Sequence, residues 1–198
     1  MLSLSKHCTA VVLAAGTGSR FGGQKLLANV NGKPMIARVL AAVAHLPTVV
    51  VGSPELRAHV GDATFVENAA PERGMSYSLR LADERVDRSH GLLVMLADMP
   101  FMTRAIVDTI VNGVDDADVC YPQRAGIGGH PVFFSSQART KIAALPDGDT
   151  LRALRDDPAL THLVIDIADD GAYRDIDRAC DLGAPTTGTS YRPEPGQT

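Results

Sequence analysis

The sequence predicts an α/β fold in three layers, in which a mostly parallel, doubly wound sheet lies between two layers of helices. First, short apolar runs alternate with helix-like segments from the start of the chain to about Tyr121. Second, the run at residues 91–97 is apolar throughout, as expected of a central parallel strand that is covered on both faces. Third, 198 residues with 45% hydrophobic content are enough to build one such core.

Apolar runs bounded by turn residues define the predicted strands. The run at 48–51, for example, is ended by Gly52-Ser53-Pro54. The alternation of strands and helices stops at a glycine-rich turn over 126–131, so the last part of the sheet is expected to differ from the first. In chain order, the predicted strands cover residues 9–15, 48–51, 64–66, 91–97, 118–121, 132–134 and 163–165.

Helical spacing and capping residues define the predicted helices. Pro34 is expected at the first position of a helix, after a turn at Asn31-Gly32. Thr103 is expected to cap a later helix. The apolar residues of that helix form one inward stripe: Ile106, Val107, Ile110 and Val111. Further helices are predicted at 54–60, 76–86, 136–145 and 150–155, with a polar loop at 68–75.

A glycine-rich loop with two cations follows the first strand. It places four glycines in eight positions, at 16, 18, 22 and 23, together with Arg20 and Lys25. Glycines let backbone N–H groups approach phosphate oxygens, and the cations neutralise charge, so the loop predicts a polyphosphate site. The spacing fits neither common phosphate motif: Phe21 stands where a dinucleotide loop needs glycine, and Gln24-Lys25-Leu26 replaces the end of a Walker A loop. The alternative is a flexible turn.

Carboxylates supply a possible metal site at the same edge of the sheet. Asp98 directly follows the apolar strand at 91–97, and ligands of open α/β sheets bind at the carboxyl ends of the strands. Asp175 and Asp177 flank Ile176 in an extended segment and therefore face the same side. Mg²⁺ commonly takes one or two carboxylates plus substrate phosphates. The alternatives are that Asp98 caps its own turn and that the later pair is a solvated edge.

Charge and cysteine content limit the partners and the compartment. The formal net charge is −4 and no basic stripe is present, which argues against a nucleic-acid partner. No apolar run approaches the length of a membrane span, so we expect no membrane association. The three cysteines are far apart and form neither a disulfide framework nor a metal motif, which is typical of a reducing cytoplasm.

Five motifs in order resemble the MobA/MocA-like nucleotidyltransferases, and most closely the molybdopterin (molybdenum cofactor) cytidylyltransferases. The chain departs from the pattern at Ala97, where relatives usually have glycine, and at 178–180, where Arg-Ala-Cys replaces Thr-Pro-Glu. The motifs span nearly all of residues 9–182. They are the segment at 13–25, Gly74-Met75-Ser76-Tyr77-Ser78-Leu79, Leu96-Ala97-Asp98-Met99-Pro100, Gly129-His130-Pro131-Val132, and Asp175-Ile176-Asp177 followed by Asp181-Leu182.

The resemblance implies a Rossmann-like, GT-A-like sheet and a role for each matching residue. Arg20 would hold the leaving pyrophosphate and Lys25 the α-phosphate, so both would be catalytic with Asp98. Asp98, together with Asp175 or Asp177, would hold Mg²⁺, with Mn²⁺ as an alternative. His130 either lies on the acceptor side or simply fills its turn. The implied nucleotide-binding residues are Leu13, Ala14, Ala15, Gly16, Gly18, Ser19, Arg20, Lys25, Asn68, Gly74, Ser76 and Ser78.

The implied reaction is transfer of a nucleoside monophosphate from an NTP to a phosphorylated acceptor, with release of pyrophosphate. CTP is favoured over GTP because guanylyl relatives tend to carry Gly-Gly where this chain has Ala14-Ala15. The expected acceptor is molybdopterin or the molybdenum cofactor, and a molybdoenzyme or a cofactor-insertion protein would be the protein partner. Two alternatives stay open: a sugar phosphate or another phospho-acceptor, and a non-catalytic nucleotide-binding module. We expect one domain over 1–182 and a disordered tail over 183–198.

Overall fold

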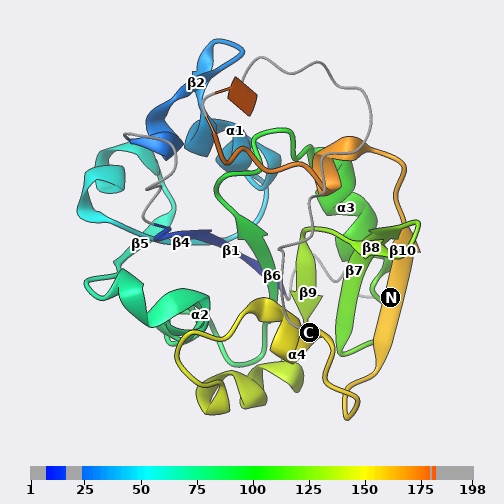
Figure 1. Cartoon of the computed structure of the whole chain (residues 1–198). Coiled ribbons are helices and arrows are strands. Elements are labelled where there is room, and N and C mark those ends of the chain that lie inside the picture. Colours follow the sequence, from blue (N-terminus) through cyan, green and yellow to red (C-terminus); the bar gives the residue numbers. More distant parts are fainter. Residues whose placement is uncertain (1–7, 17–23, 179, 182–198) are drawn as a thin grey trace, which may run out of the picture.

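The structure is a computed structural model that describes residues 8–16, 24–178, 180 and 181. Its centre is a mixed sheet with the strand order β10-β7-β9-β6-β1-β4-β5, in which β8 pairs with β7. The strands β1, β4, β5 and β6 run parallel to one another, whereas β9 is antiparallel to both of its neighbours, β6 and β7. Helices cover both faces of the sheet, which confirms the predicted three-layer α/β fold (Figure 1).

The predicted strands are all present, with ends that differ by at most three residues. Two short antiparallel elements, β8 and the hairpin β2–β3, were not predicted as strands. The strands of the main sheet are β1 Cys8–Ala14, β4 Thr48–Gly52, β5 Thr64–Glu67, β6 Gly91–Leu96, β7 Val119–Arg124, β8 Ile127–Gly128, β9 Val132–Phe134 and β10 His162–Asp166, and the hairpin is β2 Asn29–Val30 and β3 Lys33–Pro34.

The helices lie where the sequence predicts them, but several differ from the prediction in helix type or in their first residue. Pro34 is the residue before the first turn of α1, because its ring and extended backbone end the hairpin instead of opening the helix. Two predicted helices are 3-10 helices, and α2 begins at Gly74, inside the predicted polar loop. The α-helices are α1 Met35–Ala42, α2 Gly74–Asp83, α3 Arg104–Gly113 and α4 Leu151–Arg155, and the 3-10 helices are η2 Lys25–Leu27, η3 Pro54–His59, η4 Pro71–Arg73, η5 Ala138–Ala144 and η6 Asp170–Ala172.

The central strands divide their side chains between two cores. In β1, Ala10 and Val12 pack in a core with α1 and α3, whereas Val11 and Leu13 pack in a core with α2, η5 and α4. This alternation follows from the period of two along a strand. Figure 1 shows α1 and α3 on one side of the sheet and α2 and α4 on the other. Both faces are covered, and ligands of open α/β sheets bind at the carboxyl ends of the strands, so a ligand site is expected at that edge.

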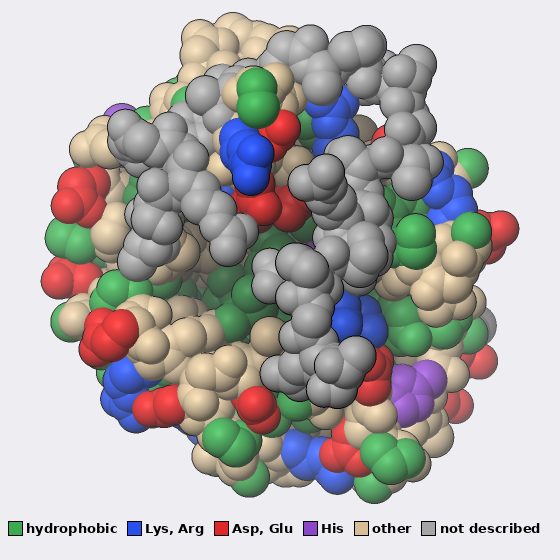
Figure 2. All heavy atoms as spheres, viewed as in Figure 1, with side chains coloured by type: hydrophobic (Ala, Val, Ile, Leu, Met, Phe, Trp, Pro, Cys, Tyr) green, Lys and Arg blue, Asp and Glu red, His purple; other side chains and the backbone are tan. Residues whose placement is uncertain are grey.

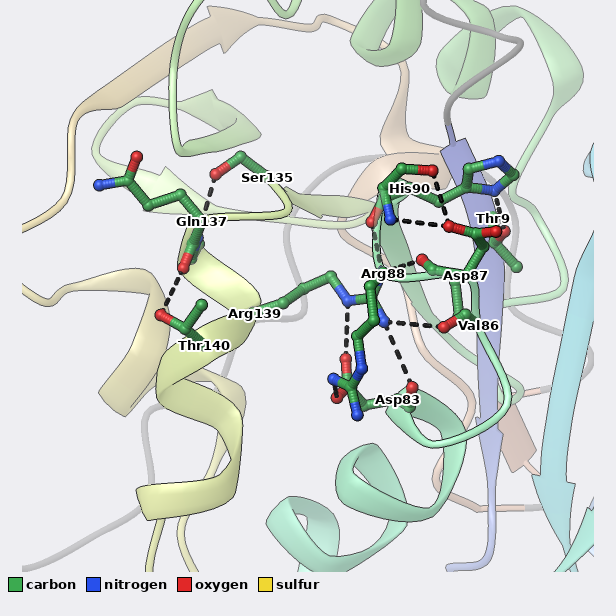
Figure 3. Close-up of polar contacts among 12 residues, drawn as sticks. Thr9, Asp83, Val86, Asp87, Arg88, His90, Ser135, Gln137, Arg139 and Thr140 are labelled. Carbon is green, nitrogen blue, oxygen red and sulfur yellow. Dashed lines mark hydrogen bonds and ion pairs between the residues drawn. The ribbon is translucent and has the colours of Figure 1, made fainter.

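The edge of the sheet opposite to those carboxyl ends is held together by a buried guanidinium. Arg139 of η5 donates from Nε to Asp83 Oδ1 at 2.7 Å, and the two other nitrogens of its guanidinium donate to carbonyl oxygens of the segment between α2 and β6 (Figure 3). The other oxygen of Asp83 accepts a hydrogen bond from Arg88 at 2.7 Å. The Arg139 side chain is 2% exposed and that of Arg88 is 74% exposed, so one carboxylate has a buried and an exposed partner.

We expect Arg139→Met to lower the free energy of unfolding by about 3–5 kcal/mol, because it removes the buried donor of the Asp83 carboxylate and of several carbonyls. Urea denaturation followed by circular dichroism measures the loss. Arg88→Met is the matched control: its exposed ion pair with the same carboxylate should contribute about 1 kcal/mol or less. Equal losses for the two variants would contradict this account of the cluster.

The length and apolar character of the helices bear on membrane association. Within residues 8–16 and 24–181, excluding 179, no helix combines the length and apolar character that crossing a membrane requires.

Candidate functional site

Four parallel strands end together at one edge of the sheet, and pocket-lining residues follow each of them. Ala15 and Gly16 follow β1, Ser53 follows β4, Asn68 follows β5, and Asp98 comes two residues after β6. Two adjoining pockets of about 240 and 350 Å³ open there and share lining residues. Both are lined by Ala14, Ala15, Gly16, Lys25, Leu26 and Pro71. On the face drawn in Figure 2, basic and acidic side chains gather beside a hollow with a hydrophobic floor.

Lys25 joins two of the three carboxylates that the sequence offers as metal ligands. Its Nζ donates to Asp98 Oδ2 at 2.9 Å and to Asp177 Oδ1 at 3.1 Å. The Lys25 side chain is 11% exposed, that of Asp98 is 26% exposed and that of Asp177 is 54% exposed. The structure therefore brings together the end of the predicted phosphate loop, the end of β6 and the C-terminal acidic segment.

Backbone contacts hold the two carboxylates near each other. The amide of Ile176 donates to the carbonyl of Asp98 at 2.9 Å, and the Ile176 side chain is fully buried against Val30 and Met35. Burial of Ile176 turns Asp175 and Asp177 outward, as the predicted period of two requires, although the segment forms no strand. The turn at Asp98 closes through its own backbone, from Met99 N to Leu96 O at 3.3 Å, which leaves the Asp98 carboxylate oriented to Lys25.

The charges of this cluster act on one another. Burial of the Lys25 ammonium alone would lower its pKa, but the adjacent Asp98 and Asp177 carboxylates outweigh that effect and raise the pKa. The pKa of Asp175 is raised, first by desolvation of its carboxyl and then by the negative charges of Asp98 and Asp177. The site thus has more negative charge than Lys25 neutralises.

Two carboxylates with surplus negative charge suit a hard divalent cation. Among the described residues, no three His, Cys, Asp or Glu side chains are placed to hold one metal ion by themselves. Asp98 and Asp177 share a cation, the Lys25 ammonium, and one or two carboxylates are the usual protein ligands of Mg²⁺ when phosphates supply the rest. The donor set therefore fits a cation that binds together with a phosphorylated ligand.

The N-terminus of α2 forms the wall of the smaller pocket. Gly74, Met75 and Ser78 line that pocket, and Asn68 lines the larger one. The buried Asn68 amide donates from Nδ2 to Ser78 Oγ at 3.0 Å, so the end of β5 and the first turns of α2 are fixed to each other. The hydroxyl of Ser76 donates instead to the Pro146 carbonyl at 2.7 Å, and Ser76 lines neither pocket.

His130 lies two residues before β9 in the chain and beside the neighbouring strand β6. Its Nδ1 is 3.4 Å from the Val94 carbonyl oxygen, and its amide donates to the Ala172 carbonyl at 2.8 Å. Burial lowers the pKa of His130, so the imidazole is neutral near neutral pH. A neutral imidazole can exchange a hydrogen bond with a ligand but contributes no positive charge. His130 is absent from the linings of the two pockets described above.

Three predicted site residues, Gly18, Ser19 and Arg20, lie outside the described residues. The pocket linings in turn contain residues that were not predicted: Gln24, Leu26, Leu27, Ser53, Glu55, Leu56, Pro71, Met75, Leu96 and Ala97. Ser53 and Glu55 follow a predicted strand, as Asp98 does, so their position in the sequence could have identified them as site residues. Ala97 is 1% exposed, and its methyl group packs in the core with α1 and α3.

Comparison with known proteins identifies a family. Residues 10–162 match the family described as the MobA-like NTP transferase domain. The chain is 34% identical over 151 residues to the bifunctional protein GlmU of Rhizobium etli, a match that covers 75% of this chain and 28% of that protein. It is 29% identical over 157 residues to GlmU of Allorhizobium ampelinum, covering 76% of this chain and 29% of that protein. The chain thus spans less than a third of the length of these curated relatives.

Solved structures share the fold. The Rv0371c homologue of Mycobacterium sp. strain JC1 superposes with a TM-score of 0.73 at 24% identity, covering 88% of this chain and 92% of that one. Molybdopterin-guanine dinucleotide biosynthesis protein A of Archaeoglobus fulgidus gives 0.66 at 19% identity, covering 88% and 94%. Rv0371C of Mycobacterium tuberculosis H37Rv, solved in complex with manganese, gives 0.62 at 23% identity, covering 81% and 89%.

Proposed function

The chain belongs to the MobA-like NTP transferase family, and on that premise we propose that it transfers a nucleoside monophosphate from CTP to a phosphorylated acceptor. The proposed acceptor is molybdopterin or the molybdenum cofactor, the second product is pyrophosphate, and the required cation is Mg²⁺, which Mn²⁺ can replace. The observation that carries the proposal is the contact of Lys25 with both Asp98 and Asp177 beside two pockets at the carboxyl edge of the sheet.

The residues suit in-line transfer between two phosphates. An acceptor phosphate oxygen attacks the α-phosphorus of the NTP, and the bond from that phosphorus to the bridging oxygen of pyrophosphate breaks. Because an acceptor phosphate is already an anion near neutral pH, the reaction needs positioning and charge neutralisation instead of a general base. Lys25 supplies an ammonium whose pKa is raised, so it stays charged throughout the working pH range. A divalent cation between Asp98 and Asp177 would add Lewis-acid stabilisation of the phosphate oxygens.

The base preference rests on the small residues at the end of β1. Ala14 is buried and Ala15 half-buried, and both line the two pockets beside Gly16. Their methyl groups narrow the space where guanylyl relatives tend to carry two glycines. A smaller space favours a pyrimidine over a purine, and this supports CTP.

Release of pyrophosphate from each of the four NTPs tests the proposal. The purified full chain is incubated with Mg²⁺ and, in separate arms, molybdopterin, the molybdenum cofactor, a hexose 1-phosphate or no acceptor. We expect release with CTP in the arms with molybdopterin or the molybdenum cofactor. Release only with the hexose phosphate would identify a sugar-phosphate enzyme. Binding of CTP without release in any arm would indicate a non-catalytic nucleotide-binding module.

We expect Gly74→Ala to raise the KM for the NTP about tenfold, because it disturbs the α2 terminus at the pocket wall. Gly74 has φ +84°, and a Cβ atom there would lie 2.8 Å from Cα of Gly148, so the backbone must shift. Steady-state kinetics at saturating acceptor measure the change. Gly61→Ala is the control, since Gly61 also has a positive φ of +59° but open space around it. An unchanged KM in Gly74→Ala would remove α2 from the nucleotide site.

A further inference from the structure

Asp181 folds back onto the backbone of Asp177. Its Oδ2 accepts hydrogen bonds from the amide of Asp177 at 3.1 Å and from the amide of Arg178 at 2.7 Å. The amide of Asp181 donates to the Arg178 carbonyl at 3.0 Å, which closes the same turn in the other direction. Hydrogen bonds to an ionised carboxylate are about twice as strong as those between neutral groups. The backbone amides on both sides of the Asp177 Cα are therefore fixed by a side chain four residues further along.

The same turn is attached to the segment that follows Asp98. The carbonyl of Asp181 accepts a hydrogen bond from Arg174 Nη2 at 3.3 Å. The guanidinium of Arg174 lies over the ring of Phe101, 4.1 Å from its centroid. On its N-terminal side, Asp177 is held by the Ile176 amide, which donates to the Asp98 carbonyl. Both ends of the Asp177 residue are thus tied to the β6 end of the site.

This restraint matters because the Asp177 side chain is more than half exposed, at 54%. An exposed carboxylate ordinarily samples several rotamers, and ordering it for a ligand costs conformational entropy. Partners that orient a metal ligand without touching the metal typically contribute a factor of 10–100 to metal affinity. A fixed backbone leaves only the side-chain rotamer of Asp177 to be ordered when a cation binds.

We propose that Asp181 is a positioning residue, which holds Asp177 where its carboxylate can bind a divalent cation together with Asp98. The inference rests on the proposed function, because it needs that cation. The resemblance to relatives includes Asp181 in a motif but gives it no role. The structure gives Asp181 two amide hydrogen bonds at the ligand's own backbone.

Binding of Mn²⁺ alone to the full chain tests this role, with free Mn²⁺ measured by electron paramagnetic resonance. We expect Asp181→Ala to weaken binding about tenfold. Asp181→Asn keeps an oxygen acceptor at the same place and should bind within about twofold of the unchanged protein. Asp116→Ala, which removes one exposed carboxylate at the opposite edge of the sheet, controls for the loss of charge. Thermal unfolding of each variant reports stability separately.

Three outcomes would overturn the proposal. Asp181→Ala could leave Mn²⁺ affinity unchanged while lowering the melting temperature, which would make Asp181 merely structural. Asp181→Asn could lose as much affinity as Asp181→Ala, which would make its charge the cause instead of its geometry. Finally, Asp177→Asn could bind Mn²⁺ normally, and that result would remove the metal site of the proposed function itself. Weaker binding in Asp177→Asn with normal binding in Asp181→Ala would reject only the positioning role.

Discussion

Asp98→Asn should lower kcat about 10²–10³-fold while the protein stays folded. Asp98 lies at the end of the central strand β6 and is one of two carboxylates that contact Lys25 Nζ. An asparagine in its place removes the negative charge that a divalent cation needs. The fold should tolerate the change, because the contact that joins the two acidic segments uses the Asp98 carbonyl and not its carboxylate. Pyrophosphate release with CTP, Mg²⁺ and the acceptor measures kcat.

The stability of this variant separates a functional from a structural role. The Lys25–Asp98 pair is partly exposed, so its loss should change the free energy of unfolding by about 1 kcal/mol at most. Asp116→Asn, a change of the same kind at an exposed loop residue, should leave both kcat and stability unaltered. If Asp98→Asn retained Mg²⁺-dependent turnover equal to that of the unchanged protein, Asp98 would have no part in the metal site.

Much of this site could be predicted because it follows from the residue types in short stretches of the sequence. An all-apolar run predicts where β6 ends, and a charged residue directly beyond it, Asp98, cannot lie in the core. Glycines and a lysine after β1 predict an anion site for the same local reason. Parallel strands then bring the two ends to one edge of the sheet, as the general rule for α/β sheets requires.

The rest could not be predicted because it depends on contacts between distant segments. Asp177 reaches Asp98 through the amide of Ile176 and the burial of that side chain against Val30 and Met35. Nothing in the spacing of Asp175 and Asp177 shows which partner they meet.

Ser76 illustrates the opposite case: it stands in a motif expected at the nucleotide, yet its hydroxyl is donated to the Pro146 carbonyl. Arg139 is likewise buried, although no pattern in the sequence distinguishes it from an exposed arginine.

Lys25→Met should lower kcat about 10²–10³-fold, because it removes the ammonium that would neutralise the α-phosphate in the transition state. Lys25 keeps its charge at any working pH, since Asp98 and Asp177 raise its pKa. A methionine of similar length preserves the apolar contacts of the lysine stem. The assay is the same pyrophosphate release, and Lys33→Met, at an exposed residue of the β2–β3 hairpin, is the control for loss of one positive charge.

The same variant should affect metal binding in the opposite sense. Without a nucleotide, Lys25 is the cation that Asp98 and Asp177 share, so a divalent ion must compete with it for these carboxylates. Lys25→Met should therefore bind Mn²⁺ alone at least as tightly as the unchanged protein does, although turnover is lost. Lost turnover together with retained Mn²⁺ binding is the result expected if Lys25 contacts the phosphate and the two aspartates bind the metal. Weaker Mn²⁺ binding in Lys25→Met would show instead that Lys25 supports the metal site, and its role at the phosphate would lose its basis.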